Sequence, residues 1–306
     1  MTKKTYAKAL LTTMLFTTAC DRSYDVLFLD DGFPDLEPKK YATDILSSGN
    51  KYVQNITMTS DGREHLFTET TLKDWNYTGI VRLRRLQDNS LAFDTLRIVN
   101  EFKFQNMQFI GEPQISPDDK TLVFVADYPT DIWISKRKET GDWGTPLKLN
   151  EEINSPSDEF YPNIASDGTL YFMSKRTGEA RIYKSELENG QYKSAQKVQA
   201  TFNNDDAGDH IFSHKMDYVI FSADRDEGYG KADLYISFKK DDGEWSKAYH
   251  FGPGINTEAF ELGPYISPDD MYLFFTRRDE WKEATFSDIY WVSLNIVSEL
   301  RNKIKN

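Results

Sequence analysis

Apolar positions along this chain form short unbroken runs, without the spacing of a helix and without simple alternation. Each run follows a tight turn such as Ser-Pro-Asp-Asp or Ser-Asp-Gly, as residues 122–126 follow residues 115–119. Proline presets φ, aspartate bonds nearby backbone and glycine accepts positive φ, so these turns connect the two strands of a hairpin. A strand with one face in water should alternate, and the unbroken runs therefore predict strands buried on both faces.

This hairpin phrase occurs five times. The phenylalanines that close its copies stand 57, 48, 49 and 54 residues apart, at Phe67, Phe124, Phe172, Phe221 and Phe275. Three further phrases recur at similar distances: Asp-Ile-Tyr, a Gly-x-Trp turn and an Ile-Asn step. A period near 50 residues made of four strands is typical of propeller blades. We predict an all-β fold, a five-bladed β-propeller of four-stranded blades, with six blades as the alternative.

The last repeat is incomplete, because no fourth strand can follow residues 288–292. Residues 41–47 resemble the outer strands of the other repeats, and an N-terminal strand that completes the last blade would leave no open edge. We therefore expect residues 43–46 beside residues 289–292. The expected organisation is a signal peptide over residues 1–19, an extended tether over 20–40, one propeller domain over 41–300 and a tail over 301–306.

The N-terminus predicts export. Lys3, Lys4 and Lys8 precede a short apolar stretch, and a small residue stands before Cys20, the one cysteine of the chain. This pattern is typical of a secretory signal and is too short to anchor the chain across a bilayer. It favours a bacterial lipoprotein that is lipidated on Cys20 and faces the periplasm or the cell surface. The alternative is a plain secreted protein.

Charge narrows the choice of partner. The chain has 49 acidic and 37 basic side chains, a net charge of −12, and the leader contributes three of the lysines. Such a surface is a poor match for nucleic acid, which binds basic patches. We expect a monomer without nucleic acid as a partner.

The repeats resemble the WD40-like repeats of TolB-type propellers, in a subgroup of exported bacterial proteins. The resemblance covers most of residues 41–300 and is carried best by residues 153–172, 232–245 and 288–292. It implies the propeller fold and a protein partner in the cell envelope. Two repeats depart from the pattern: the first lacks Asp-Ile-Tyr, and the fourth has His214-Lys-Met in place of Pro-Asp-Gly.

Acidic residues recur at the start of the innermost strand in four of the five repeats. If these strands line a channel, the carboxylates should gather at one of its mouths, where oxygen ligands could hold Ca²⁺ or a ligand's hydroxyl groups. The alternative is a structural role in bonding loop backbone. The candidate ligand or cation residues are Asp158, Glu159, Asp206, Asp209 and Glu261.

Other recurring charges predict internal pairing. Arg176, Arg225 and Arg278 follow the second strands, and aspartates begin the third strands at residues 131, 233 and 288, so we expect pairs within each blade. Aromatic residues that do not recur are better candidates for contact with a partner. They are Trp75, Tyr77 and Trp281.

The sequence favours a binding function. It contains no Gly-x-Ser-x-Gly motif, phosphate loop or Gly-x-Gly-x-x-Gly motif, and His210 and His214 lack the helical setting of a zinc-protease motif. We expect a non-enzymatic envelope lipoprotein that binds a protein or a glycan and needs no cofactor. The alternative is a glycan-active enzyme with two carboxylates roughly 5–10 Å apart at the channel.

Overall fold

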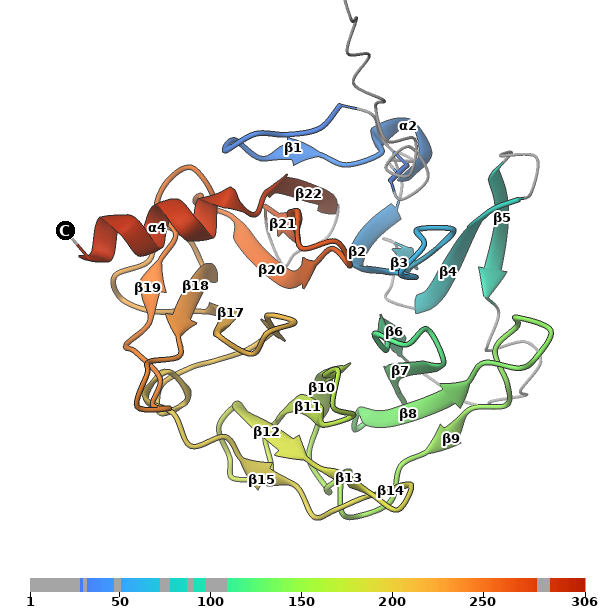
Figure 1. The fold of residues 1–306 in the computed structure, drawn as a ribbon. Helices are drawn as coiled ribbons and strands as arrows, with labels where there is room; N and C mark the ends of the chain where they lie inside the picture. The colour runs from blue at the N-terminus through green and yellow to red at the C-terminus, as the bar shows by residue number, and fades with distance from the viewer. Residues whose placement is uncertain are drawn as a thin grey trace, which may run out of the picture.

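Five small sheets form a ring around a central axis (Figure 1). The computed structural model describes residues 28–29, 32–46, 51–71, 78–86, 91–96, 109–279 and 287–305. Each main sheet has four antiparallel strands that follow one another from the axis outward, apart from the outermost strand of the fifth sheet. The predicted five-bladed propeller of four-stranded blades is confirmed.

The blades are built from consecutive strands. Blades 1 and 2 contain β2 (Lys51–Met58), β3 (Glu64–Thr71), β4 (Thr78–Arg85) and β5 (Leu91–Leu96), then β6 (Ile110–Ile115), β7 (Thr121–Ala126), β8 (Asp131–Lys136) and β9 (Leu147–Lys148). Blades 3 and 4 contain β10 (Glu159–Ile164), β11 (Leu170–Ser174), β12 (Arg181–Ser185) and β15 (Gln196–Lys197), then β16 (His210–Phe212), β17 (Tyr218–Ala223), β18 (Asp233–Phe238) and β19 (Tyr249–His250). Blade 5 contains β20 (Phe260–Ile266), β21 (Tyr272–Arg278), β22 (Ser287–Ser293) and β1 (Lys39–Lys40). Blade 3 also carries the hairpin of β13 (Leu187–Glu188) and β14 (Gln191–Tyr192), and the 3-10 helix η1 (Thr201–Asn203) follows it.

The N-terminal strand completes blade 5, as predicted. Lys39 of β1 lies opposite Trp291 of β22, and Lys40 lies opposite Tyr290. The Lys40 ammonium also pairs with Asp288 at 2.6 Å. The two ends of the chain therefore share one blade, and the ring is closed.

The residues predicted for this strand were wrong. Residues 43–46 form the short helix α2 (Thr43–Leu46), because the chain turns away from β22 directly after Tyr41. The Tyr41 N–H still donates to the Ile289 carbonyl at 2.8 Å, and Ala42 then takes a left-handed φ of 46°. This turn directs Leu46 into a core shared by blades 5 and 1.

The second strands are buried as predicted. Every residue of β7, β11 and β17 is buried, since each blade lies between two neighbours.

The recurring asparagines bind the backbone of the third strands. Asn203 accepts the Ile182 N–H at 2.8 Å and donates to the Ile182 and Val198 carbonyls at 2.9 Å, and Asn154 and Asn256 make the equivalent bonds to Ile132 and Leu234. Each side-chain amide thus adds hydrogen bonds to the backbone of the third strand.

The predicted pairing of Arg225 with Asp233 was wrong. The third-strand aspartates contact a basic side chain of the fourth strand, in the pairs Asp131–Lys148, Asp233–His250 and Asp288–Lys40. The arginines lie over the aromatic rings of the middle strands, where a guanidinium is attracted to the ring face. Their distances to the third-strand rings are 4.7 Å for Arg176 over Tyr183, 4.9 Å for Arg225 over Tyr235 and 4.4 Å for Arg277 over Tyr290. In blade 5 the arginine that lies over the third-strand ring is Arg277, whereas the sequence analysis had named its neighbour Arg278.

Four innermost strands carry a left-handed residue near the axis, at Asn55, Glu112, Tyr161 and Gly263. A bulge accompanies each one. The N–H of each left-handed residue donates to a side chain of the preceding blade, and we call these bonds the axial ring. They are Asn55 to Thr276 (3.2 Å), Glu112 to Thr68 (2.8 Å), Tyr161 to the Glu112 carboxylate (2.6 Å) and Gly263 to the Asp209 carboxylate (2.7 Å).

Helix α4 (Asn295–Lys305) ends the described chain and crosses the predicted boundary between propeller and tail. Its residues Ile296 and Val297 bury their side chains in a core shared by blades 4 and 5. None of the helices in the described ranges has the length and apolar character needed to cross a bilayer.

Candidate functional site

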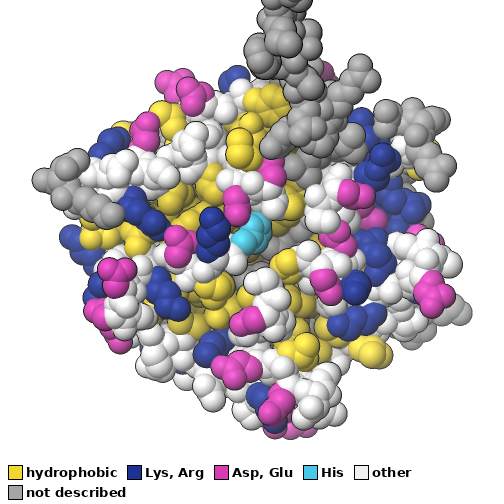
Figure 2. Space-filling model, in the orientation of Figure 1, with side chains coloured by type: hydrophobic (Ala, Val, Ile, Leu, Met, Phe, Trp, Pro, Cys, Tyr) yellow, Lys and Arg dark blue, Asp and Glu magenta, His cyan; other side chains and the backbone are white. Residues whose placement is uncertain are grey.

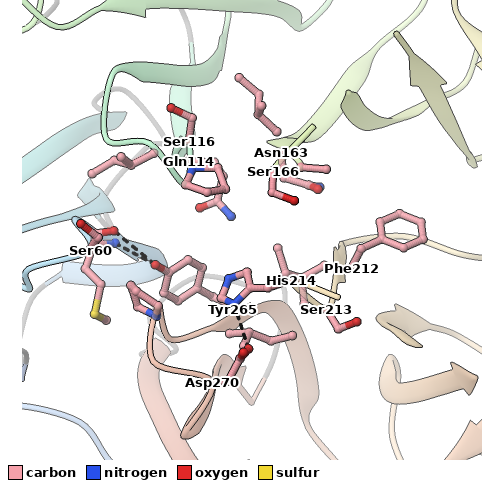
Figure 3. Close-up of a pocket in the computed structure, with 18 of the residues that line it drawn as sticks. Ser60, Gln114, Ser116, Asn163, Ser166, Phe212, Ser213, His214, Tyr265 and Asp270 are labelled. Atoms are coloured by element: carbon pink, nitrogen blue, oxygen red, sulfur yellow. Dashed lines mark hydrogen bonds and ion pairs between the residues drawn. The ribbon is translucent and has the colours of Figure 1, made fainter. Parts of the chain in front are cut away.

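A pocket of about 300 Å³ opens at the end of the channel where the hairpin turns of all five blades meet. Figure 2 shows hydrophobic side chains among polar ones at the centre of this face. The pocket wall combines apolar groups with hydroxyl and amide groups, and the labelled side chains surround one open space in Figure 3. Each blade contributes to it, for example through Met58, Gln114, Asn163, Phe212 and Tyr265. We call this cavity the mouth pocket.

The turns that form the rim are held rigid by their own side chains. The Ser116 hydroxyl donates to Asp118 at 2.6 Å and accepts the Thr121 N–H at 2.9 Å. Ser267 makes the same two bonds with Asp269 and Tyr272. Because these bonds fix the turns, the pocket walls are organised before any ligand arrives.

One turn position from each repeat lines the mouth pocket. These positions are Ser60, Pro117, Ser166, His214 and Pro268. His214 belongs to the fourth repeat, whose turn departs from the Pro-Asp-Gly pattern of the other repeats. Its Nδ1 lies 2.8 Å from the Asp270 carboxylate of blade 5, and both side chains are partly exposed. The sequence analysis nominated no residue of this turn face as a binding candidate, although the irregular fourth turn was a usable signal.

A second carboxylate bridges the rim on the other side. Asp119 of blade 2 accepts the Ser60 N–H of blade 1 at 2.9 Å. Asp119 and Asp270 hold the same position in their turns, and both have a φ of 59°. The rim carboxylates are therefore used to join neighbouring blades.

Beneath the mouth pocket the channel narrows to a cavity of about 30 Å³, lined in part by the four left-handed residues of the axial ring. That volume holds little more than one water molecule. Burial raises the pKa of Asp209 to about 7, against the lowering effect of its bond from Gly263, and burial raises the pKa of Glu112 well above its usual range. Two buried acids therefore lie near the axis, on either side of Tyr161, and the pKa of Tyr161 is raised by burial and by their charges.

The two glutamates nominated from the sequence are part of the frame at the opposite ends of the innermost strands. Glu159 and Glu261 are both 0% exposed. Glu159 accepts from Ser155 at 2.6 Å and from Ser174 at 2.8 Å, and it pairs with Arg176. Glu261 has the equivalent partners Thr257 and Arg277, each at 2.7 Å.

The three nominated aspartates also lie outside the mouth pocket. Asp158 accepts the Thr130 N–H at 3.0 Å and so joins blades 3 and 2. Asp206 is exposed and accepts the Asp224 N–H at 3.2 Å. Asp209 belongs to the axial ring. A ligand or cation at these acids stays a prediction.

Four other nominated residues lie outside the described residues. They are Cys20, Trp75, Tyr77 and Trp281. Within the described ranges, no group of three or more His, Cys, Asp or Glu side chains could hold a metal ion.

Neither a protein-family model nor a curated protein sequence matches this chain. Solved structures do resemble it. TolB from Acinetobacter baumannii is 14% identical with a TM-score of 0.49, and the match covers 79% of this chain but 54% of that protein, so the chain spans about half its length. An α-L-arabinofuranosidase from Podospora anserina, solved with cellotriose, is 12% identical with a TM-score of 0.51, over 85% of this chain and 94% of that one. The catalytic domain of an α-L-arabinofuranosidase from Coprinopsis cinerea is 9% identical, with the same TM-score and coverage.

These similarities concern the fold. The two arabinofuranosidases match the chain almost from end to end at very low identity. Unrelated functions share propeller frames, so the likeness supports the architecture and leaves the activity to be argued from the site.

Proposed function

We propose that this chain is a non-catalytic binding protein of the cell envelope, which receives a projecting segment of a partner protein in the mouth pocket. The observation that carries the proposal is the composition of that pocket. All five blades contribute to it, so a bound segment would contact the whole ring at once. Its rim is organised in advance by turn hydrogen bonds, which lowers the entropy cost of binding.

The lining favours a protein segment over a glycan. Met216, Pro117 and Pro268 line the pocket with exposed or half-buried apolar groups, and the flexible methionine can adapt to varied side chains. A sugar ring binds best on the open face of an aromatic side chain. The pocket's two aromatic residues, Phe212 and Tyr265, are 5% and 7% exposed and offer no such face.

Gln114 supplies a polar anchor. Its side-chain amide points into the pocket in Figure 3. An amide can both donate to and accept from the backbone of an extended segment.

The alternative of a glycan-active enzyme needs two accessible carboxylates facing a cleft. Glu159 and Glu261 are buried and bonded within their blades. Asp119 and Asp270 face the mouth pocket but are held by Ser60 and His214. These engagements support a binding role.

Export and lipidation at Cys20 are part of the proposal. The anchor would hold the propeller at a membrane surface by the N-terminal segment. Replacing Cys20 with serine should release the protein from the membrane fraction. Equal membrane retention of the variant would count against the anchor.

The test of the binding site is to block it. Ser166 is an exposed rim residue, so Ser166→Trp should fill the mouth pocket and leave the fold intact. Glu139→Trp, on the exposed outer hairpin of blade 2, is the matched control. We expect the wild type and the control to capture the same partner from envelope extract, and Ser166→Trp to lose it. Equal capture by all three would refute the site.

A further inference from the structure

The mouth pocket carries negative charge that its own lining does not balance. Two carboxylates line it, Asp119 from blade 2 and Asp270 from blade 5. No lysine or arginine is among the described residues of the lining, although the chain has 37 of them and all five blades contribute to the wall. Complementary charge steers and selects a partner, so the pocket favours a cationic group over an anionic one.

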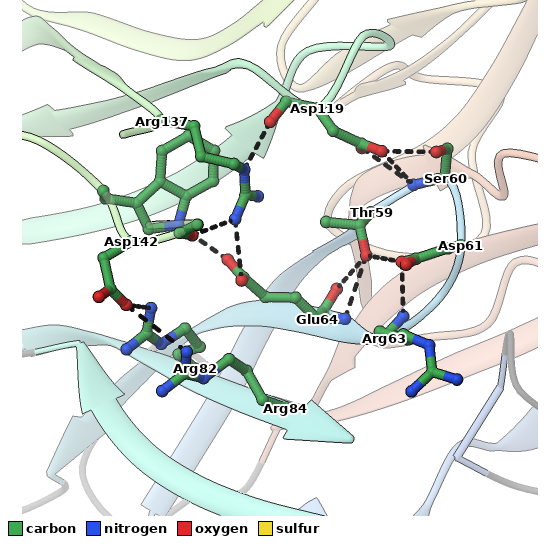
Figure 4. A network of polar contacts seen from close by, with 12 residues as sticks. Thr59, Ser60, Asp61, Arg63, Glu64, Arg82, Arg84, Asp119, Arg137 and Asp142 are labelled. Atoms are coloured by element: carbon green, nitrogen blue, oxygen red, sulfur yellow. Dashed lines mark hydrogen bonds and ion pairs between the residues drawn. The ribbon is translucent and has the colours of Figure 1, made fainter. Parts of the chain in front are cut away.

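The charge of Asp119 is retained because its partner is neutral. Its carboxylate accepts the Ser60 N–H at 2.9 Å and the Ser60 hydroxyl at 2.5 Å (Figure 4). These bonds orient the carboxylate and leave its negative charge in place. Burial raises the pKa of Tyr265 in the pocket wall, and the charge of Asp119 raises it further. The field of this carboxylate therefore reaches the pocket.

Asp270 is paired with a histidine that offers the pocket an acceptor. His214 Nδ1 lies 2.8 Å from the Asp270 carboxylate, at the edge of the open space in Figure 3. In the neutral imidazole this Nδ1 carries the hydrogen and donates it, so Nε2 is an acceptor. Nε2 makes no hydrogen bond within the described residues, and the His214 and Asp270 side chains are 35% and 43% exposed. The pair thus presents a lone pair as well as negative charge.

Most polar hydrogens of the pocket wall are already donated within the protein. The hydroxyls of Ser60, Ser116 and Ser213 each donate to an aspartate, at 2.5, 2.6 and 2.7 Å. The Asn163 amide donates to the His210 ring and to backbone carbonyls. A hydroxyl has one hydrogen to donate but two lone pairs. The wall is therefore rich in acceptors and poor in available donors, which suits a ligand group that only donates.

The apolar part of the wall fits the stem of a basic side chain. Met216, Pro117 and Pro268 present exposed or half-buried apolar groups. Lysine and arginine pack an aliphatic stem against such surface and carry their charge at its end. With a volume of about 300 Å³, the pocket is at the small end of ligand sites and takes single side chains in preference to a folded element.

Building on the proposed function, we infer that the segment received by the mouth pocket inserts a lysine or arginine side chain, whose cation faces Asp119 and the His214–Asp270 pair. An ammonium or guanidinium group has donors and no acceptor, so it matches the acceptors and the charge of the wall. Bonds from such a cation to a carboxylate are charge-assisted and roughly twice as strong as neutral ones.

Selection from a phage-displayed library of random peptides tests the inference with the exported protein as bait. Peptides that also bind Ser166→Trp are removed, so the peptides that are kept depend on the open pocket. We expect a lysine or arginine at one fixed position of the kept peptides. If no peptide depends on the open pocket, the proposed function fails and the inference fails with it. If the kept peptides lack a basic residue, the proposed function stands and only the inference is overturned.

The role of the charge is tested with paired peptides. A selected peptide is synthesised again with citrulline for arginine or acetyl-lysine for lysine, which removes the positive charge. We expect the neutral peptide to bind the wild type at least ~10-fold more weakly in calorimetric titration. Asp119→Asn with Asp270→Asn should weaken the charged peptide similarly and reduce the preference for it, because the cation and the carboxylates are coupled. Equal binding of the two peptides by the wild type would overturn the inference.

The matched control is Glu139→Gln with Asp241→Asn, which removes two exposed negative charges from the outer hairpins of blades 2 and 4. It should bind both peptides as the wild type does. If the double aspartate variant fails to fold, Asp270→Asn alone serves, since that side chain is exposed. The inference is also overturned if the aspartate variants bind the charged peptide as tightly as the control does.

Discussion

Asp209 gives the sharpest prediction, because its carboxylate is buried in the axial ring. Burial raises its pKa from 3.8 to about 7, and the Gly263 N–H only partly offsets this. The folded-state pKa lies above the unfolded value, so ionisation disfavours the folded state. The contribution of this group to stability is present below about pH 4 and is lost as the pH rises through about 7. The difference between the two pKa values, at ~1.4 kcal/mol per pH unit, corresponds to a loss of roughly 4 kcal/mol in the free energy of unfolding.

Asp209→Asn removes the ionisation and keeps an oxygen for the Gly263 N–H. Its free energy of unfolding, minus that of the wild type, should increase by roughly 1.4 kcal/mol per pH unit between about pH 4 and 7 and level off above. Urea unfolding followed by tryptophan fluorescence at several pH values measures this difference.

The comparison with wild type is needed because His210 opposes the trend. Burial lowers the pKa of His210 from 6.5 to about 3, so its contribution to stability is complete above pH 6.5 and is lost as the pH falls toward 3. The difference between variant and wild type cancels this effect. The exposed Asp241→Asn variant is the control and should show no pH-dependent difference. A flat difference for Asp209→Asn as well would mean that water reaches this carboxylate, and the packed axis would be refuted.

Three further predictions concern the frame. Glu159→Gln breaks a buried ion pair and should lower the free energy of unfolding by about 3 kcal/mol, while the exposed Asp206→Asn should leave it unchanged. An unchanged stability of Glu159→Gln would favour the ligand-site interpretation of that residue. Asn203→Ala leaves buried backbone groups of β12 without partners and should lower the free energy of unfolding in urea by roughly 2–4 kcal/mol. The exposed Asn204→Ala is the control and should show no measurable loss. Equal stability of the two variants would contradict the role of Asn203 in holding the third strand. A chain that begins at residue 41 lacks β1 and should melt well below one that begins at residue 28, unless blade 5 is stable without its fourth strand.

Repetition made the fold predictable. A sequence motif repeated about every 50 residues predicts the strands, the turns and the number of blades, because each copy supports the interpretation of the others. The closing strand was harder, because β1 has two residues and carries no apolar pattern of its own. Residues 41–47 imitate a strand in sequence, yet the left-handed Ala42 ends the pairing.

The site was less predictable for physical reasons. Glu159 and Glu261 are alike because blades 3 and 5 each use a buried carboxylate to bind a loop hydroxyl and an arginine, and a repeated acid gives no sign in the sequence of whether it faces a channel or a loop. The axial ring depends on left-handed φ at Glu112 and Tyr161, which neither residue type predicts. His214 was visible as an exception to the repeat, and exceptions proved more informative about the turn face than the repeated residues.

The most direct test of the central claim is photocrosslinking from the rim of the mouth pocket. A photoreactive amino acid at position 166, with position 139 as the control, is activated in intact cells that express the exported protein. We predict one defined crosslinked protein from position 166 and none from position 139. No product from the rim, or the same products from both positions, would contradict a partner seated on the turn face.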